Sequence, residues 1–416
     1  MTRDDLIDGL LVDSLPAARR SRRISVVTET YPPEVNGVAM SLARLVDGLH
    51  ARDHDVQLIR PRQRDADPAA GLSRFEEFLT GGLPILRYPN LRMGVPSKRA
   101  LVQLWSLRRP DVVHIATEGP LGWSALHAAL HLKLPVTSDF RTNFHAYGQH
   151  YRLGWLAKPI MGYLRKFHNR TQATMVPTEA LRAELARSGF ERLTVVSRGV
   201  DTKLFDPGRR SESLRGRWGV TADDLVMAYV GRLAPEKNLG VLLQAYKTVR
   251  DAMPQARLLL VGDGPLRTSL QASCPEAIFA GQQRGDELAA HYASADMFLF
   301  PSVTETYGNV TPEAMASGLP VVAFDCAAAG QMIQSGRNGV LVADENGAAF
   351  AHAALTLAAD PVRRASLAAA ARATARRFEW GDVVERFESV LVHAIDQSPL
   401  GRGSSWPRLG RRAAAG

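Results

Sequence analysis

The sequence predicts an α/β protein with parallel, doubly wound sheets, and three observations point to this class. Short apolar runs alternate with longer segments of helical periodicity along most of the chain, which is the pattern of βαβ units. Polar or glycine-rich loops follow several of these runs, at the strand ends where such sheets bind ligands. The 416 residues are enough for two domains of ordinary size, each with its own core.

In the first half of the chain, strands and helices are expected in regular alternation. Strands are expected at about 24–28, 55–60, 84–88, 111–116, 135–139 and 173–177, and helices at 38–50, 97–109, 119–132, 150–170 and 178–188. The helix at 38–50 has an apolar stripe made by Leu42, Leu45, Val46 and Leu49. One face of this helix should therefore lie on the core.

A turn-rich connector at 198–210 ends this half of the chain. Beyond it, strands are expected at 225–231, 296–300 and 321–324. A helix at 310–317 should end at Gly318, with a proline just beyond it. The alternation continues to residue 340, one helix then runs to about 378, and a last helix with an apolar face covers 380–395.

The net charge of +9 does not by itself indicate a nucleic-acid-binding protein. Five of these charges come from the two ends, 1–23 and 398–416, and the remaining body is close to balanced. Both ends have the composition of poorly ordered tails. Cys274 and Cys326 have neither metal-ligand spacing nor a disulfide pattern, which indicates a reducing, cytoplasmic compartment. No apolar run approaches the length that spans a bilayer.

The chemistry is expected in the stretch 301–325, where Glu305 and Glu313 flank a Gly-Asn turn that leads into a helix. The first helical amides belong to Gly308, Asn309 and Val310. Unpaired amides at the carboxyl end of a parallel strand favour a phosphate group. The alternative is an ordinary βαβ unit, in which Glu305 caps a helix and Glu313 is solvated.

The same stretch resembles the Glu-x7-Glu signature of retaining, nucleotide-sugar-dependent glycosyltransferases of family four. TETYGNVTPEAMASGLPVVA matches that signature almost throughout. The resemblance implies the GT-B architecture, in which two Rossmann-like, doubly wound domains face a cleft, with the donor mainly on the second domain and the acceptor mainly on the first. The implied division is a tail at 1–22, a first domain at 23–200 with a returning helix at 380–397, a second domain at 201–379, and a tail at 398–416.

The resemblance also implies roles for residues of the second domain. Glu305 would contact hydroxyls of the donor sugar, and Glu313 would accept hydrogen bonds from the ribose. Arg232 and Lys237, in a GR-x4-K element, would hold the diphosphate together with the amides of the helix start. Gly281 lies in the loop that holds the base, mainly through backbone atoms. No metal and no other cofactor is implied.

In the first domain, the family's loop after the first strand lies over the donor phosphates, which assigns Gly37 and the neighbouring Asn36 to the donor site. Many relatives place a histidine after a later strand, where it contacts the donor sugar and its phosphate. Here Arg141 occupies that position, and His145 lies four residues on. Both are candidate catalytic residues, and the alternative for His145 is a surface or packing histidine.

The segment 148–178 resembles the corresponding region of diacylglycerol-acting members such as sulfoquinovosyl-diacylglycerol synthases, and the chain is also similar to GDP-mannose-dependent α-mannosyltransferases. Within it, 152–170 has five Lys or Arg residues, no acidic residue, and apolar residues at helical spacing. Such a helix can lie on an anionic membrane surface. It can equally pack on the core with a solvated basic face.

The expected activity is transfer of a hexose, with retention, from a UDP- or GDP-linked sugar to a hydroxyl acceptor, with a membrane glycerolipid or glycolipid as the candidate acceptor. The expected location is the cytoplasm, with the cytoplasmic face of the membrane as a candidate site of action. Two alternatives stay open: a GT-B sugar-nucleotide epimerase or phosphorylase, and a basic α/β protein that binds nucleic acid. The sequence indicates neither the donor base nor the oligomeric state.

Overall fold

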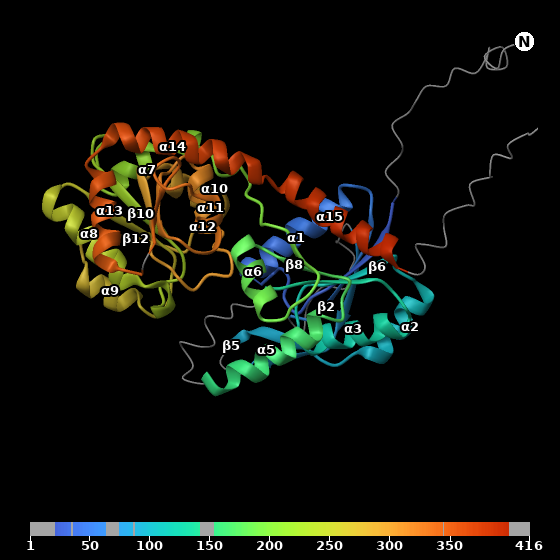
Figure 1. The fold of residues 1–416 in the computed structure, drawn as a ribbon. Coiled ribbons are helices and arrows are strands. Elements are labelled where there is room, and N and C mark those ends of the chain that lie inside the picture. The colour runs from blue at the N-terminus through green and yellow to red at the C-terminus, as the bar shows by residue number, and fades with distance from the viewer. Residues whose placement is uncertain are drawn as a thin grey trace, which may run out of the picture.

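The computed structural model describes residues 21–34, 36–63, 75–85, 88–141, 154–343 and 345–398. They form two parallel sheets in two lobes, each sheet with helices on its faces (Figure 1). The predicted tails fall almost entirely on residues 1–20 and 399–416, which lie outside the described part of the chain.

The first sheet has the strand order β3-β2-β1-β6-β7-β8-β9, and neighbouring strands in it are parallel. Its strands are β1 (Arg23–Val27), β2 (Asp55–Pro61), β3 (Glu76–Thr80), β6 (Val112–Ile115), β7 (Val136–Asp139), β8 (Ala173–Val176) and β9 (Leu193–Val195). Along the chain, β2 and β3 are added on one side of β1, and β6 to β9 are then added on its other side. The carboxyl ends of β1 and β6 therefore form a crevice, the usual place for a ligand.

The helices of this half are α1 (Gly37–His50), α2 (Lys98–Leu107), α3 (Pro120–His131), α5 (Gly154–His168) and α6 (Glu179–Arg187). The predicted stripe on α1 is confirmed, because Leu42, Leu45, Val46 and Leu49 are all buried. They pack with residues of β1 and β2 in one core, whereas Trp105 of α2 packs on the other side of the sheet.

Three expectations for this half were wrong or incomplete. The strand expected at 84–88 is a hairpin of β4 (Gly82–Ile85) and β5 (Tyr88–Gly94), which is antiparallel and outside the main sheet. The edge strands β3 and β9 were not predicted, because their residues are only half-buried and show no apolar run. The helix expected at 150–170 is seen as α5, and residues 142–153 lie outside the described part.

The second sheet has the strand order β12-β11-β10-β13-β14-β15, again with parallel neighbours. Its strands are β10 (Val226–Val230), β11 (Arg257–Val261), β12 (Ile278–Gly281), β13 (Met297–Phe300), β14 (Val321–Phe324) and β15 (Val340–Val342). Its helices are α7 (Glu212–Arg217), α8 (Leu239–Ala252), α9 (Arg267–Ser273), α10 (Gly285–Ala293), α11 (Val310–Ala316), α12 (Ala327–Met332), α13 (Gly347–Ala358) and α14 (Pro361–Ala375). Along the chain, β11 and β12 are added on one side of β10, and β13 to β15 are then added on its other side. The strand order therefore reverses between β10 and β13, and the second crevice lies at their carboxyl ends.

The single helix expected to run to about 378 is two helices, α13 and α14. Pro361 begins the second, and the Asp360 side chain accepts a hydrogen bond from the Arg363 amide as its cap. Proline is favoured at a first helical position but breaks a continuing helix, so it separates the two. Helix α11 ends as expected, with Gly318 in a left-handed conformation at φ +75°.

The last helix, α15 (Trp380–Gln397), packs on the first sheet although the chain reaches it from the second lobe (Figure 1). Its Phe387 ring meets the His114 ring edge to face at 4.8 Å. Where the chain returns, the Val200 amide donates to the Phe378 carbonyl at 2.8 Å. The Arg372 guanidinium donates to the carbonyls of Thr202 and Phe205 at 3.1 and 2.7 Å. The two chain segments between the lobes are therefore bound to each other.

Candidate functional site

The centre of the candidate site is an ion pair between Lys237 and Glu305, two residues far apart in the sequence. Lys237 ends a short 3-10 turn after β10, and Glu305 lies in the loop after β13. The two loops meet because β10 and β13 are neighbours in the sheet. The Glu305 carboxylate also accepts a hydrogen bond from the Ser302 hydroxyl at 2.8 Å. Both ion-pair side chains are mostly buried, with exposed fractions of 18% and 15%.

The Arg232 guanidinium lies at the edge of this site. It pairs with the Glu236 carboxylate at 3.2 Å, and its side chain is 56% exposed. The Glu236 carbonyl accepts a hydrogen bond from the Thr304 hydroxyl at 2.8 Å, which ties the Arg232 loop to the Glu305 loop. Lys237 is thus held beside Glu305, whereas Arg232 would have to leave Glu236 to bind the same phosphate as Lys237.

The turn between Glu305 and α11 requires a glycine. Gly308 has φ +85°, a left-handed conformation that other residues adopt only with strain. A Cβ atom there would lie 3.4 Å from Glu305 Cγ and 3.5 Å from the Phe300 ring. The following Asn309 makes no side-chain cap to the helix. Asn309 and Val310, the predicted phosphate-binding positions, therefore begin α11 directly beside Glu305.

Glu313 lies in α11 and receives a hydrogen bond from the Tyr292 hydroxyl at 2.9 Å. Burial raises the pKa of Glu313 to about 7, and the Tyr292 hydrogen bond offsets only part of that rise. Burial, with the nearby Glu313 carboxylate as a second cause, raises the pKa of Tyr292 well above its usual value. Glu313 is therefore a carboxyl group that changes its charge near neutral pH.

The first lobe meets this turn through α1. A Cβ atom on Gly37 would lie 3.5 Å from Asn309 Nδ2, so the two predicted donor-site residues face each other across the lobes. Asn36 has a structural function, because its side-chain oxygen caps α1 by accepting from the Val38 and Ala39 amides at 3.0 and 2.8 Å. Gly281 ends β12 at φ +70°, at the same carboxyl edge as Lys237 and Glu305.

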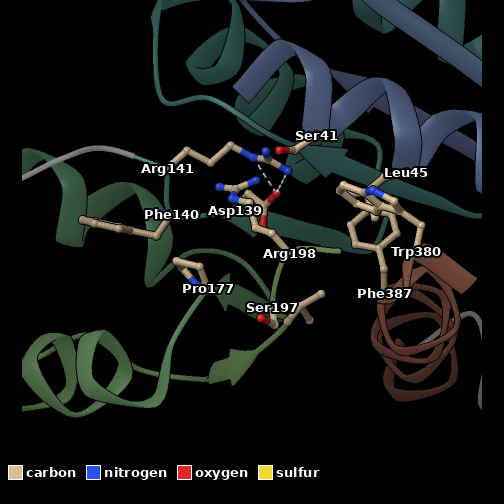
Figure 2. Close-up of a pocket in the computed structure, with 11 residues that line it drawn as sticks. Ser41, Leu45, Asp139, Phe140, Arg141, Pro177, Ser197, Arg198, Trp380 and Phe387 are labelled. Atoms are coloured by element: carbon tan, nitrogen blue, oxygen red, sulfur yellow. Dashed lines mark hydrogen bonds and ion pairs between the residues drawn. The ribbon is translucent and has the colours of Figure 1, made fainter. Parts of the chain in front are cut away.

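Arg141 follows β7 and is buried against Asp139, to which its Nε atom donates at 2.7 Å. Burial acts to raise the pKa of Asp139, but Arg141 and His114 outweigh it and hold that pKa below its usual value. Arg198, in the connector after β9, was not predicted; together with Asp139 and Arg141 it lines a small pocket at the carboxyl end of the first sheet (Figure 2). Its place in the RGVD segment is the signal that could have found it. His145 lies outside the described residues.

Within the described ranges, no group of three or more His, Cys, Asp or Glu side chains could hold a metal ion. In the same part of the chain, none of the helices has the length and apolar character needed to cross a membrane. Cys274 and Cys326 are both free thiols.

Comparisons with known proteins identify the family. Residues 224–360 match the model described as glycosyl transferases group 1, and residues 35–204 match glycosyltransferase family 4. A GDP-mannose-dependent alpha-mannosyltransferase of Mycolicibacterium smegmatis is 34% identical over 379 residues, which are 89% of this chain and 98% of the relative. An alpha-monoglucosyldiacylglycerol synthase of Acholeplasma laidlawii is 27% identical over 341 residues, 76% of this chain and 84% of the relative.

Among solved structures, Anabaena Alr3699/HepE in complex with UDP superimposes with a TM-score of 0.72 at 19% identity, over 89% of this chain and 100% of that one. This likeness concerns the fold, and it agrees with the two parallel sheets and the crevices described above. The chain therefore belongs to the glycosyl transferases of group 1, the family 4 glycosyltransferases, and has their GT-B fold.

Proposed function

We propose that this glycosyltransferase moves mannose, with retention of configuration, from GDP-mannose to a hydroxyl group of a membrane glycerolipid or glycolipid. The observation that carries the proposal is the Lys237–Glu305 pair at the point where the second sheet reverses its strand order. That place suits a nucleotide sugar, because a cation for the diphosphate and a carboxylate for the sugar hydroxyls stand side by side.

The choice of donor and acceptor is supported by the relatives. The Mycolicibacterium relative, matched over nearly its whole length, is named as GDP-mannose-dependent. The name of the Acholeplasma relative specifies a diacylglycerol product. Transfer is likewise favoured over the epimerase or phosphorylase alternative by these names.

In the proposed donor complex, each group has one task. The Lys237 ammonium has three donor hydrogens, so it can keep Glu305 and also bind a phosphate oxygen. Arg232 binds the other phosphate when the lobes close. Glu305 accepts hydrogen bonds from the sugar, Glu313 accepts them from the ribose, and the loop at Gly281 holds the base through its backbone.

The reaction begins as the bond between the anomeric carbon and the phosphate oxygen breaks. Negative charge grows on the departing phosphate, where Lys237 and the amides around Asn309 stabilise it in a site that excludes water. The acceptor oxygen attacks from the same face, and the departing phosphate takes the acceptor proton. A double displacement would require a carboxylate nucleophile at the reacting carbon. Glu305 is assigned to the sugar hydroxyls and Glu313 to the ribose, so no protein nucleophile is assigned.

Helix α5 is the proposed contact with the membrane. It buries Leu164 and Phe167 in the first lobe, whereas Tyr163, Arg165 and Lys166 are exposed. The exposed basic residues Arg165 and Lys166 suit the headgroup region of an anionic bilayer, whereas the Tyr163 hydroxyl donates to the Glu118 carbonyl at 2.7 Å. Sedimentation with phosphatidylglycerol vesicles, but not with phosphatidylcholine vesicles, is the expected result.

The donor is tested first by thermal unfolding with GDP, UDP and ADP, each with EDTA and with Mg²⁺. A ligand at a hundred times its Kd that binds only the folded state adds about 2.7 kcal/mol of stability. Stabilisation by GDP in EDTA, followed by mannose transfer from GDP-mannose to a lipid acceptor, is expected. No stabilisation by any of the three nucleotides would refute the proposal.

A further inference from the structure

The loop 301–309, which carries Glu305, is attached to its own lobe on two sides. The Glu305 carboxylate pairs with Lys237 on the loop after β10. Two residues further on, the Tyr307 carbonyl accepts a hydrogen bond from the Ala328 amide at 2.7 Å, in the first turn of α12. These contacts place the loop within the second lobe, but they do not place it relative to the first.

The Tyr307 hydroxyl extends to the first lobe. It accepts a hydrogen bond from the Ser197 hydroxyl at 3.1 Å and donates one to the Arg198 carbonyl at 3.1 Å. Ser197 directly follows the first sheet, because the Val196 amide still pairs with a carbonyl of β8 at 2.9 Å. Tyr307 therefore joins the loop that carries Glu305 to the end of the first sheet.

A second side chain reaches the same serine from the second lobe. Gln331 of α12 donates to the Ser197 hydroxyl at 3.4 Å, and its side-chain oxygen accepts from the Glu179 amide at 3.3 Å. Glu179 is the first residue of α6, and α6 and α12 contact each other between the lobes (Figure 1). Ser197 is thus bound by two side chains of the second lobe, Tyr307 and Gln331.

The packing of the second lobe accounts for the Tyr307 ring but not for its hydroxyl. The side chain is 3% exposed and its ring belongs to the core of that lobe, where a phenylalanine would fit equally well. Burial raises the pKa of Tyr307 above its usual value, so the hydroxyl keeps its proton and remains a hydrogen-bond donor. The hydroxyl therefore has its contacts in the connector rather than in the core.

These contacts lie next to the place where the chain crosses between the lobes. The Val200 amide, two residues after Arg198, donates to the Phe378 carbonyl of the returning segment at 2.8 Å. When two domains rotate about a hinge, the atoms closest to the axis move least. The hydrogen bonds of Tyr307 can therefore persist through opening and closing, and they give the loop one position relative to the first lobe.

We propose that Tyr307 is a positioning residue, whose hydroxyl fixes the Glu305 loop relative to the first lobe and so aims the donor sugar at the acceptor. This inference rests on the proposed function, in which the donor lies on the second lobe and the acceptor on the first. Glu305 binds the sugar, and Tyr307 sets where the bound sugar stands. A small displacement of reacting groups from their productive geometry lowers the rate severely.

The first test needs no substrate. Amide hydrogen exchange of residues 302–309 is measured in the full chain for the wild type, Ser197→Ala and Ser106→Ala. Ser197→Ala changes the first lobe, yet it should speed exchange of this second-lobe segment about 2- to 10-fold, as expected for the loss of a neutral hydrogen bond. Ser106→Ala, which removes an exposed hydroxyl from α2, should have no effect. Unchanged exchange in Ser197→Ala would overturn the proposal.

The second test is Tyr307→Phe, which keeps the ring and removes the hydroxyl. The kcat for mannose transfer should fall about 5- to 50-fold through the loss of two hydrogen bonds, while the Kd for GDP stays the same. Tyr246→Phe is the matched control, because this buried tyrosine of α8 has a hydroxyl without a partner in the described part of the chain. Full activity of Tyr307→Phe would show that the ring only packs. Weaker GDP binding would assign Tyr307 to the donor instead, and either result would overturn the proposal.

The double variant of Tyr307→Phe and Ser197→Ala shows whether the two side chains act as one unit. It should be no slower than Tyr307→Phe alone, because the Ser197 hydrogen bond ends on the Tyr307 hydroxyl. Effects on kcat that multiply would mean independent roles and would overturn the proposal. A wild-type protein that neither binds GDP nor transfers mannose would refute the proposed function, and the hydrogen-exchange test would then decide alone whether Tyr307 joins the lobes.

Discussion

The affinity for GDP should depend on pH through Glu313, and the dependence should disappear in Glu313→Gln. Burial raises the pKa of this carboxyl group to about 7 from the value of 4.5 for an exposed glutamate. The folded protein therefore binds the proton more tightly than the unfolded chain does. The stability due to this proton is complete below about pH 4.5 and is lost as the pH rises through about 7. A ribose that donates hydrogen bonds to Glu313 prefers the opposite state, the ionised carboxylate.

The magnitude follows from the titration. With a pKa of about 7, about one molecule in eleven carries an ionised Glu313 at pH 6, and about ten in eleven at pH 8. If the ionised form binds the ribose and the protonated form does not, the Kd for GDP falls about tenfold between these values, which corresponds to about 1.4 kcal/mol.

Calorimetric titration of GDP at pH 6, 7 and 8, for the wild type and for Glu313→Gln, measures the effect. The phosphate of GDP also titrates in this range, but it does so equally for both proteins, so the ratio of the two Kd values isolates Glu313. The Kd of Glu313→Gln divided by the Kd of the wild type should rise about tenfold from pH 6 to pH 8. With 2′,3′-dideoxy-GDP, which lacks the ribose donors, it should stay flat. A ratio for GDP that does not change with pH would refute the assignment.

Four further changes have defined expectations. Lys237→Ala should weaken GDP binding about 10- to 100-fold by calorimetry, because it removes a charge-assisted contact to the diphosphate; an unchanged Kd would contradict the clamp. Glu305→Gln should lower transfer about 100-fold or more while GDP still binds, and a variant with most of its activity would exclude the role. Gly308→Ala should cost about 1–3 kcal/mol in denaturant unfolding, because of the left-handed turn. Ala327 also has a left-handed conformation, at φ +50°; Ala327→Gly should therefore raise the stability by about 0.5–1 kcal/mol, and a loss would show that the strain is absorbed elsewhere.

Much of the second lobe could be predicted from the sequence, because its short strands are continuous apolar runs and its loops carry recognisable motifs. The meeting of Lys237 and Glu305 is an example: each follows a buried strand, and those strands are neighbours at the reversal of the sheet. The assigned roles of the two residues remain predictions that the proposed experiments test.

The parts that could not be predicted share a physical reason, which is that they depend on contacts distant in the sequence. Strand β3 is recognisable only through its pairing with β2, since its own residues are half-buried. The hairpin of β4 and β5 depends on antiparallel pairing, such as that of Leu83 with Met93, which a single strand at 84–88 does not contain. Arg198 stands in the connector after β9, and only the folded chain brings it into the same pocket as Arg141 and Asp139, which come much earlier in the sequence.

The double crossing between the lobes has a kinetic consequence. Two chain segments join the lobes, one at the connector near Val200 and one before α15, and they are hydrogen-bonded to each other at Phe378 and through Arg372. Two chain segments that are hydrogen-bonded to each other allow the lobes to rotate about an axis through both segments, but they resist sliding and other rotations of one lobe against the other. If the donor and the acceptor lie on different lobes, as proposed, these segments keep the two substrates at a high effective concentration for each other. In the proposed reaction, the lobes would open to release GDP, and the bonded segments would return them to the same alignment at the next closure.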